Sequence, residues 1–214
     1  MKKIFILLVL VFGIIYYYGC GDSAVNTTTT NFDGCIKATL SGWIPGNKLL
    51  YAQMNSRASG IYKVAECTVD STGYFNLCLP SLSDTTLYSS DSIFYAGCHT
   101  GNVTFNPPDV RGTQIFNYRV RFGTQIVGAV DCVTYTRSDS IKSGDFEVMY
   151  IYVNKNVTVT GSKICNSDTL QFNGSAVTGW NKIIKHYISV SQTGRTILYD
   201  GTEPPGAIWR YHGT

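Results

Sequence analysis

From residue 33 onward, the chain consists of short runs of strand-forming residues separated by turn residues at intervals of roughly 8 to 12 positions. The runs at 117–137 and 146–161 are rich in valine, isoleucine, threonine and tyrosine, with glycine or Asn-Lys-Asn where strands turn or bulge. After residue 20 we find no stretch of helical periodicity long enough for a stable helix. The sequence therefore predicts an all-β fold, an antiparallel β-sandwich of one large or two small units.

The clearest local element is a hairpin whose turn is Asp70-Ser71-Thr72-Gly73. We expect Gly73 to take a positive φ so that the hairpin can close. Because side chains alternate along a strand, the second arm should present two different faces. These faces are Phe75, Leu77 and Leu79 on one side, and Tyr74, Asn76 and Cys78 on the other.

The first residues have the order of a secretory signal. Lys2 and Lys3 precede an apolar run at 4–15, which is shorter than the ~20 residues that a transmembrane helix needs. Gly19-Cys20 at its end resembles the lipobox of bacterial lipoproteins, although Tyr17 stands where that family usually has leucine. The resemblance implies a lipoprotein signal peptide at 1–19 and a diacylglycerol on Cys20.

The polar segment that follows is too repetitive to pack, so we expect residues 20–32 to be the lipidated cysteine and a flexible tether. The expected location is the bacterial cell envelope, with lipid anchoring at the outer membrane or cell surface. We expect the rest of the chain to form two β-rich halves, at 33–110 and 111–214.

Cysteine parity supports this view of Cys20. The chain has seven cysteines, so a lipid on Cys20 would leave six, and three disulfides would suit an oxidising compartment. The alternative is that these six are buried free cysteines, which behave as small apolar side chains. Fifteen pairings stay open for Cys35, Cys67, Cys78, Cys98, Cys132 and Cys165.

Charge argues against nucleic acid as a partner. Removing Lys2 and Lys3 from 17 basic residues leaves 15 against 14 acidic ones, and only 14% of the chain is charged. Affinity for phosphate requires a clustered basic face. We therefore expect a membrane, through the lipid on Cys20, and an envelope protein or a glycan as partners.

Two stretches of the first half, "TLSGWIPGNKLLYAQ" and "AECTVDSTGYFNLCLP", resemble the carboxypeptidase-regulatory-like, transthyretin-type β-sandwich module of bacterial surface lipoproteins. In the second half, "YIYVNKNVTVTG" and "VTGWNKII" resemble the same group. The shared motifs are turns and core aromatics, so the resemblance implies a fold. It carries over no catalytic residue, because these modules are generally non-catalytic.

Metal and catalytic motifs are not apparent in the sequence. His99, His186 and His212 lie far apart, whereas a zinc site needs three or four ligands at defined spacing. There is no G-x-S-x-G elbow, H-E-x-x-H, P-loop or EF-hand series. We expect no metal, no cofactor and no enzymatic activity, with a hydrolase as a distant alternative.

Aromatic residues allow a second interpretation. Trp43, Trp180 and Trp209 could form a platform on which sugar rings stack. The competing interpretation is that Trp43 and Trp180, which each follow a glycine at a strand edge, cap a sandwich core.

Six Asp-Ser or Asp-Thr pairs, each followed by a small or aliphatic residue or threonine, resemble an O-glycosylation sequon that some Gram-negative bacteria use on exported proteins. The competing explanation is that these pairs end turns just before apolar strands. The candidate acceptors are Ser23, Ser71, Thr85, Ser92, Ser140 and Thr169.

Together these patterns predict a lipid-anchored β-sandwich lipoprotein of the envelope with a non-catalytic structural, adhesive or ligand-presenting role. A carbohydrate-binding surface lipoprotein is the alternative.

Overall fold

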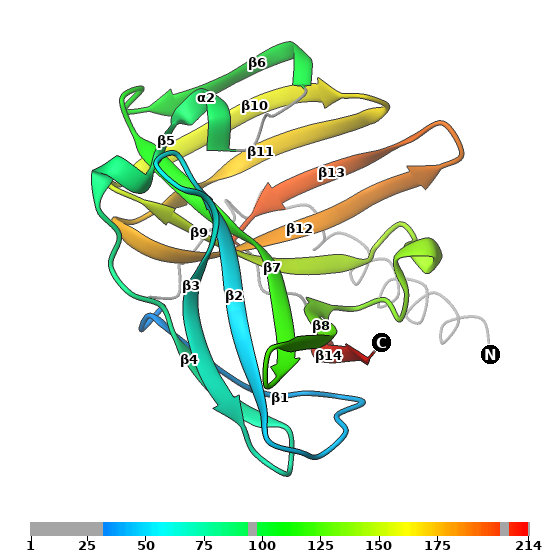
Figure 1. Cartoon of the computed structure of the whole chain (residues 1–214). Helices are drawn as coiled ribbons and strands as arrows, with labels where there is room; N and C mark the ends of the chain where they lie inside the picture. Colours follow the sequence, from blue (N-terminus) through cyan, green and yellow to red (C-terminus); the bar gives the residue numbers. More distant parts are fainter. Residues whose placement is uncertain (1–31, 94–97, 202–205, 214) are drawn as a thin grey trace, which may run out of the picture.

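A computed structural model of the chain describes residues 32–93, 98–201 and 206–213 (Figure 1). Apart from three short helical turns, the regular structure of these residues is β, which confirms the predicted all-β, sandwich-like class. Fourteen strands belong to one sheet, in the order β1-β4-β3-β2-β7-β8-β9-β12-β13-β11-β10-β6, with β14 paired to β8 and β5 to β7. No helix in the described part of the chain has the length and apolar character needed to cross a membrane.

The first seven strands are β1 (Cys35–Thr39), β2 (Lys48–Ser56), β3 (Gly60–Val69), β4 (Tyr74–Cys78), β5 (Tyr88–Ser89), β6 (Cys98–Asn106) and β7 (Arg111–Phe122). The remaining strands are β8 (Gln125–Val133), β9 (Phe146–Val153), β10 (Val157–Cys165), β11 (Asp168–Ala176), β12 (Gly179–Ser191), β13 (Gly194–Asp200) and β14 (Ile208–Gly213). The helical turns are η1 (Asp84–Thr86), α2 (Ser90–Ile93) and η2 (Ser138–Ser140).

Seven strands, β1-β4-β3-β2-β7-β8-β14, close on themselves in the lower part of Figure 1, and we call them the ring. Closure occurs just after β1, where the Ser41 amide donates to the Trp209 carbonyl (2.7 Å) and the Ser41 carbonyl accepts from the Tyr211 amide (2.9 Å). The larger hydrophobic core is built mostly from ring strands, with Leu50 and Leu77 fully buried. The ring therefore supplies most of the fold's apolar burial.

The strands β9, β12, β13, β11, β10 and β6 extend from the ring as an open sheet, which we call the outer sheet (Figure 1). A second, smaller core lies there, around Phe172, Tyr187 and Ile197. Within this sheet β11 and β13 run parallel, which departs from the predicted antiparallel arrangement. Because β12 uses its other edge to pair with β9, the return strand β13 is the one that meets β11.

Strand pairing does not follow the expected division at residue 110. Strand β6, before that point, pairs with β10 after it, while β7, after it, pairs with β2. Both halves contribute to each core. The two expected halves are thus joined within one continuous sheet.

The predicted hairpin is present between β3 and β4. Asp70 Oδ1 accepts hydrogen bonds from the amides of Thr72 (2.8 Å) and Tyr74 (3.0 Å), and Gly73 has a φ of 87°. A side chain at Gly73 would meet the Cβ of Trp43. Phe75, Leu77 and Leu79 are buried, and Tyr74, Asn76 and Cys78 are exposed, as the alternation predicts.

Among the described residues two disulfides are present, Cys35–Cys78 and Cys98–Cys165, so the predicted third bridge among these six cysteines is wrong. Cys67 is a free thiol on β3, and Cys132 is buried on β8 outside both bridges. Strands β2 and β7 lie between β3 and β8. The two cysteines outside the bridges thus lie on strands that are not neighbours in the sheet. Cysteine parity therefore no longer supports a lipid on Cys20.

Candidate functional site

Strand β7 changes partners along its length and so opens a gap in the sheet. Residues 112–114 pair with β9, and residues 118–122 pair with β8. Residues 115–117, between these two segments of β7, pair with neither β8 nor β9. Strands β8 and β9 themselves pair at Val133 and Glu147. We call this three-strand junction the fork. Backbone N–H and C=O groups along the fork lack the regular hydrogen bonds between strands that pair such groups elsewhere in the sheet.

A β-bulge lies on the other edge of β7 at the same point. Asn117 pairs with Gln53 and Ile115 with Met54 on β2, so Phe116 is an extra residue. The bulge breaks the alternation of faces, and Ile115 and Tyr118 are therefore both buried. Phe116 remains 42% exposed. This irregularity leaves an exposed aromatic residue between buried ones on the same strand, beside the fork.

The fork contains a cavity of about 130 Å³. Main-chain and side-chain groups of β7, β8 and β9 line it. Its hydrogen-bonding and aromatic lining comes from Gln114, Phe116, Asn117, Tyr118, Asp131 and Glu147.

Two side-chain atoms of residues in this lining are closed off from solvent and have no hydrogen-bond partner. They are Gln114 Oε1 and Tyr118 OH, two of the three such atoms in the described part of the chain. Tyr118 is 7% exposed, and its ring packs edge-on against Trp209 at 5.1 Å between centroids. Burial raises the pKa of Tyr118, so the phenol stays neutral. A buried polar group without a partner costs about 1–3 kcal/mol, so the fold leaves hydrogen-bonding capacity unused here.

Two carboxylates border the cavity. Partial burial raises the pKa of Asp131, and the neighbouring Glu147 charge acts in the same direction. His212 opposes this shift, with its Nε2 lying 3.5 Å from Asp131 Oδ2. Each carboxylate thus has a basic group of the chain beside it, because Lys185 accompanies Glu147.

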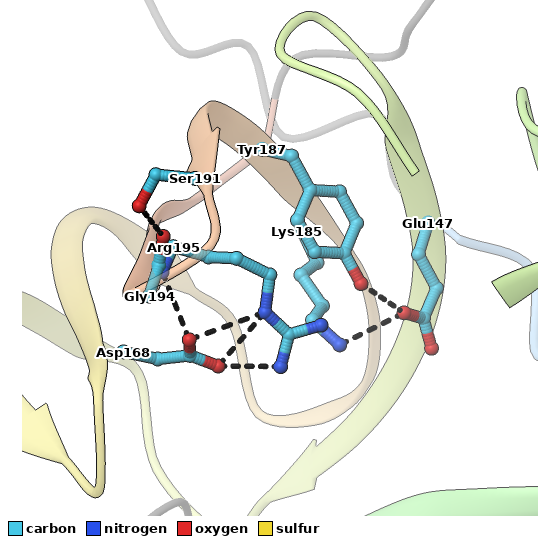
Figure 2. Close-up of polar contacts among 7 residues, drawn as sticks. All are labelled: Glu147, Asp168, Lys185, Tyr187, Ser191, Gly194 and Arg195. Carbon is cyan, nitrogen blue, oxygen red and sulfur yellow. Dashed lines mark hydrogen bonds and ion pairs between the residues drawn. The ribbon is translucent and has the colours of Figure 1, made fainter. Parts of the chain in front are cut away.

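Glu147 connects the cavity to a polar network on β9, β12 and β13 (Figure 2). Its Oε2 accepts from Lys185 Nζ (2.9 Å) and from Tyr187 OH (3.2 Å). Burial disfavours the charged form of Lys185, but Glu147 outweighs it and leaves the pKa of Lys185 raised. Burial, together with Glu147, raises the pKa of Tyr187. These contacts fix the Glu147 carboxylate in place.

The network continues to Asp168 at the start of β11 (Figure 2). Arg195 Nε lies 3.2 and 3.0 Å from the two oxygens of Asp168, and the Arg195 amide donates to Oδ1 (2.9 Å). Burial would raise the pKa of Asp168, but these hydrogen bonds lower it. The guanidinium lies 5.8 Å from the Tyr187 ring centre, and Ser191 Oγ donates to the Gly194 carbonyl (2.8 Å) in the adjoining turn. Since these groups partner one another, the network is a scaffold behind the cavity.

The tryptophan platform that the sequence allows does not include two of its three candidate members. Trp180 and Trp209 are 7% and 8% exposed, so their faces are covered by the core. Trp43 is half-buried, donates from Nε1 to the Asp70 carbonyl (3.0 Å), and has Lys48 Nζ 4.8 Å from its ring. The competing core-capping interpretation describes Trp180.

The proposed glycan acceptors differ in exposure. Ser71, Thr85 and Ser92 are exposed, whereas Ser140 and Thr169 are half-buried. Four of these five described acceptors lie in or beside turns, as both interpretations of the Asp-Ser and Asp-Thr pairs expect. The predictions for Cys20 and Ser23 concern positions outside the described residues.

The two histidines whose side chains are described, His186 and His212, lie in different surroundings. His186 stacks on Phe146 at 4.1 Å between ring centres, on β12, while His212 faces Asp131. Within residues 32–93, 98–201 and 206–213, no group of three or more histidine, cysteine or acidic side chains could hold a metal ion.

The sequence interpretation missed the fork residues Gln114, Tyr118, Asp131 and Glu147. They belong to no motif and are spread over three strands. A signal was available in Ile115-Phe116-Asn117-Tyr118, where the alternation of apolar and polar residues is broken. Such a break predicts a bulge, and bulges are common beside functional sites.

Comparisons with family models, curated proteins and solved structures find no match for this chain.

Proposed function

We propose that this chain is an exported protein, anchored to the bacterial cell envelope by a lipid on Cys20, whose β-sandwich presents a ligand without transforming it. The main observation in support of export is the pair of disulfides, Cys35–Cys78 and Cys98–Cys165. Disulfides persist in oxidising compartments and are rare in the cytosol. The basic residues, apolar run and Gly19-Cys20 at the start of the sequence support the same route.

The fork supports the ligand-presenting role. Its cavity of about 130 Å³ has the polar residues Asn117, Asp131 and Glu147 in its lining, and a concave site with a few polar groups suits a small polar molecule. Glu147 already accepts two hydrogen bonds from Lys185 and Tyr187. These contacts hold the Glu147 carboxylate in one position in the lining of the cavity. A side chain that is fixed in this way supports binding as the role of the cavity.

The anchor is tested with Cys20→Ser in the full chain, expressed in a Gram-negative host. One acyl chain binds membranes only marginally and stable anchoring takes two or more, so removing the modified sulfur should have a large effect. We expect the unmodified sequence to pellet with membranes and to incorporate labelled palmitate. Cys20→Ser should be soluble or unprocessed and unlabelled.

The matched control is Cys67→Ser, which removes a free thiol from β3 and should leave both fractionation and labelling unchanged. Membrane pelleting and labelling of Cys20→Ser at the level of the unmodified sequence would overturn the lipid anchor.

A further inference from the structure

We infer that one end of the ring docks on the surface of a lipid bilayer, an inference that rests on the membrane anchoring proposed above. This end consists of residues 40–48, 70–74 and 122–126, and we call it the tip. These segments contain the turns that join β1 to β2, β3 to β4 and β7 to β8, and they lie at the lower end of the ring in Figure 1. The tip therefore brings together three separate parts of the sequence.

Contacts between the three segments make the tip one continuous surface. Trp43 Nε1 donates to the Asp70 carbonyl (3.0 Å), which joins the first segment to the second. Lys48 Nζ donates to the Ile44 carbonyl (2.7 Å) within the first segment. The register of β2 against β7 places Lys48 beside Phe122, which joins the first segment to the third.

The tip exposes large apolar side chains. Ile44, Phe122 and Ile126 are 60%, 56% and 53% exposed, and Tyr74 is 44% exposed. These four are among ten large apolar residues that are exposed in the described part of the chain, and the other six are spread over the rest of it. Because contiguous exposed apolar surface marks a contact with a protein or a membrane, the tip is a candidate docking surface.

The residue types of the tip suit the interface between lipid and water. Trp43 is half-buried, and Lys48 Nζ lies 4.8 Å from its ring centre and 5.3 Å from that of Tyr211. Tryptophan and tyrosine are enriched at the level of lipid head groups. A lysine there lays its apolar stem on the hydrophobic surface and keeps its charge near the phosphates.

Charge in the turns does not oppose this contact. Residues 40–47, 70–73 and 123–124 contain a single charged side chain, that of Asp70. Its Oδ1 already accepts hydrogen bonds from the amides of Thr72 and Tyr74. A polar group that is hydrogen-bonded within the chain costs less to move out of water than an unpaired one.

The length of the chain before the ring lets the tip reach the membrane. Phe32 packs on Tyr150 of β9, with 5.0 Å between ring centres. From there, residues 20–32 span at most about 40 Å to the proposed lipid on Cys20. A nine-residue strand such as β2 is about 30 Å long. An anchored chain can therefore turn its tip to the bilayer, and protruding turns suit a planar surface where a groove would suit a peptide.

The test uses the full chain on vesicles of phosphatidylcholine and phosphatidylglycerol whose acyl chains carry bromine, which quenches tryptophan fluorescence at short range. The chain should float with the vesicles, and Trp43 should be quenched, as identified by the loss of that signal in Trp43→Phe. Ile44→Ser combined with Phe122→Ser should reduce this quenching at least threefold. The matched control combines Ile61→Ser with Ile188→Ser, which are 61% and 42% exposed outside the tip, and it should be quenched as the unmodified chain is.

A chain that floats with the vesicles while Trp43 is not quenched would overturn the docking and leave the anchor intact. A chain that does not float would overturn both, so the two failures are distinguishable. Equal quenching in the two double variants would also overturn the docking. A dimer in detergent that is lost in Ile44→Ser combined with Phe122→Ser would assign the tip to a second copy of the chain instead.

Discussion

The ring and the outer sheet are stabilised in different ways. The ring closes through Ser41 and concentrates fully buried side chains such as Leu50, Leu77 and Val120. Each region has one disulfide, but the outer sheet has a smaller core and adds the charge network of Figure 2. The fork lies where these two regions meet. The polar groups of the fork lack the regular hydrogen bonds between strands that occur elsewhere in the sheet. A candidate site can therefore occur inside a continuous sheet.

The largest difference is expected from matched truncations in the two cores. Leu77 in the ring is 0% exposed, and Leu170 in the outer sheet is 8% exposed. Leucine-to-alanine changes cost about 2–5 kcal/mol, and more where the surroundings cannot collapse. We expect Leu77→Ala to lose about 4 kcal/mol and Leu170→Ala about 2 kcal/mol in denaturant unfolding. Equal losses would mean that the two cores are packed alike.

The two disulfides should be nearly equivalent, in contrast to the cores. They join residues 43 and 67 positions apart, and loop-closure entropy changes slowly over that range. Replacing either pair by alanines should cost about 3 kcal/mol in thermal unfolding. Hydrogen exchange should differ, with faster exchange in β6 only when Cys98 and Cys165 are replaced. Uniform exchange in both variants would argue against a locally stabilised edge.

The sequence predicted the ring better than the outer sheet. The hairpin at Asp70 to Gly73 could be placed because turn chemistry and alternation are local properties. The parallel pairing of β11 with β13 could not, since it depends on which strand edge is left after β9 binds β12. The broken alternation at 115–118 could have indicated the bulge, but the fork itself could not be predicted, because Gln114, Asp131 and Glu147 come together only through the order of the strands.

Asp168 tests the charge network of the outer sheet. Its folded pKa is lowered from 3.8, so the stability it contributes is present above that value and is lost as pH falls through the folded pKa. Because 40% of the Arg195 side chain is exposed, screening limits the effect to about 1 kcal/mol. Asp168→Asn should therefore be less stable at pH 7 by that amount and equal to the unmodified chain near the acid limit.

The control is Asp139→Asn. Asp139 pairs with Arg137 on the surface, with side chains 66% and 77% exposed, and its replacement should not change the unfolding midpoint measurably. A larger loss for Asp139→Asn than for Asp168→Asn would contradict the assigned role of the network.

The central claim is that the fork is a break in the sheet at which buried polar groups are left without partners, and Tyr118→Phe tests it most directly. In thermal unfolding without ligand, removal of an unpartnered buried hydroxyl should leave stability unchanged or raise it by up to about 1 kcal/mol. Tyr152→Phe, which breaks a hydrogen bond to Leu82, should instead lose about 1 kcal/mol. If Tyr118→Phe loses as much as Tyr152→Phe or more, the hydroxyl serves the fold and the account is contradicted.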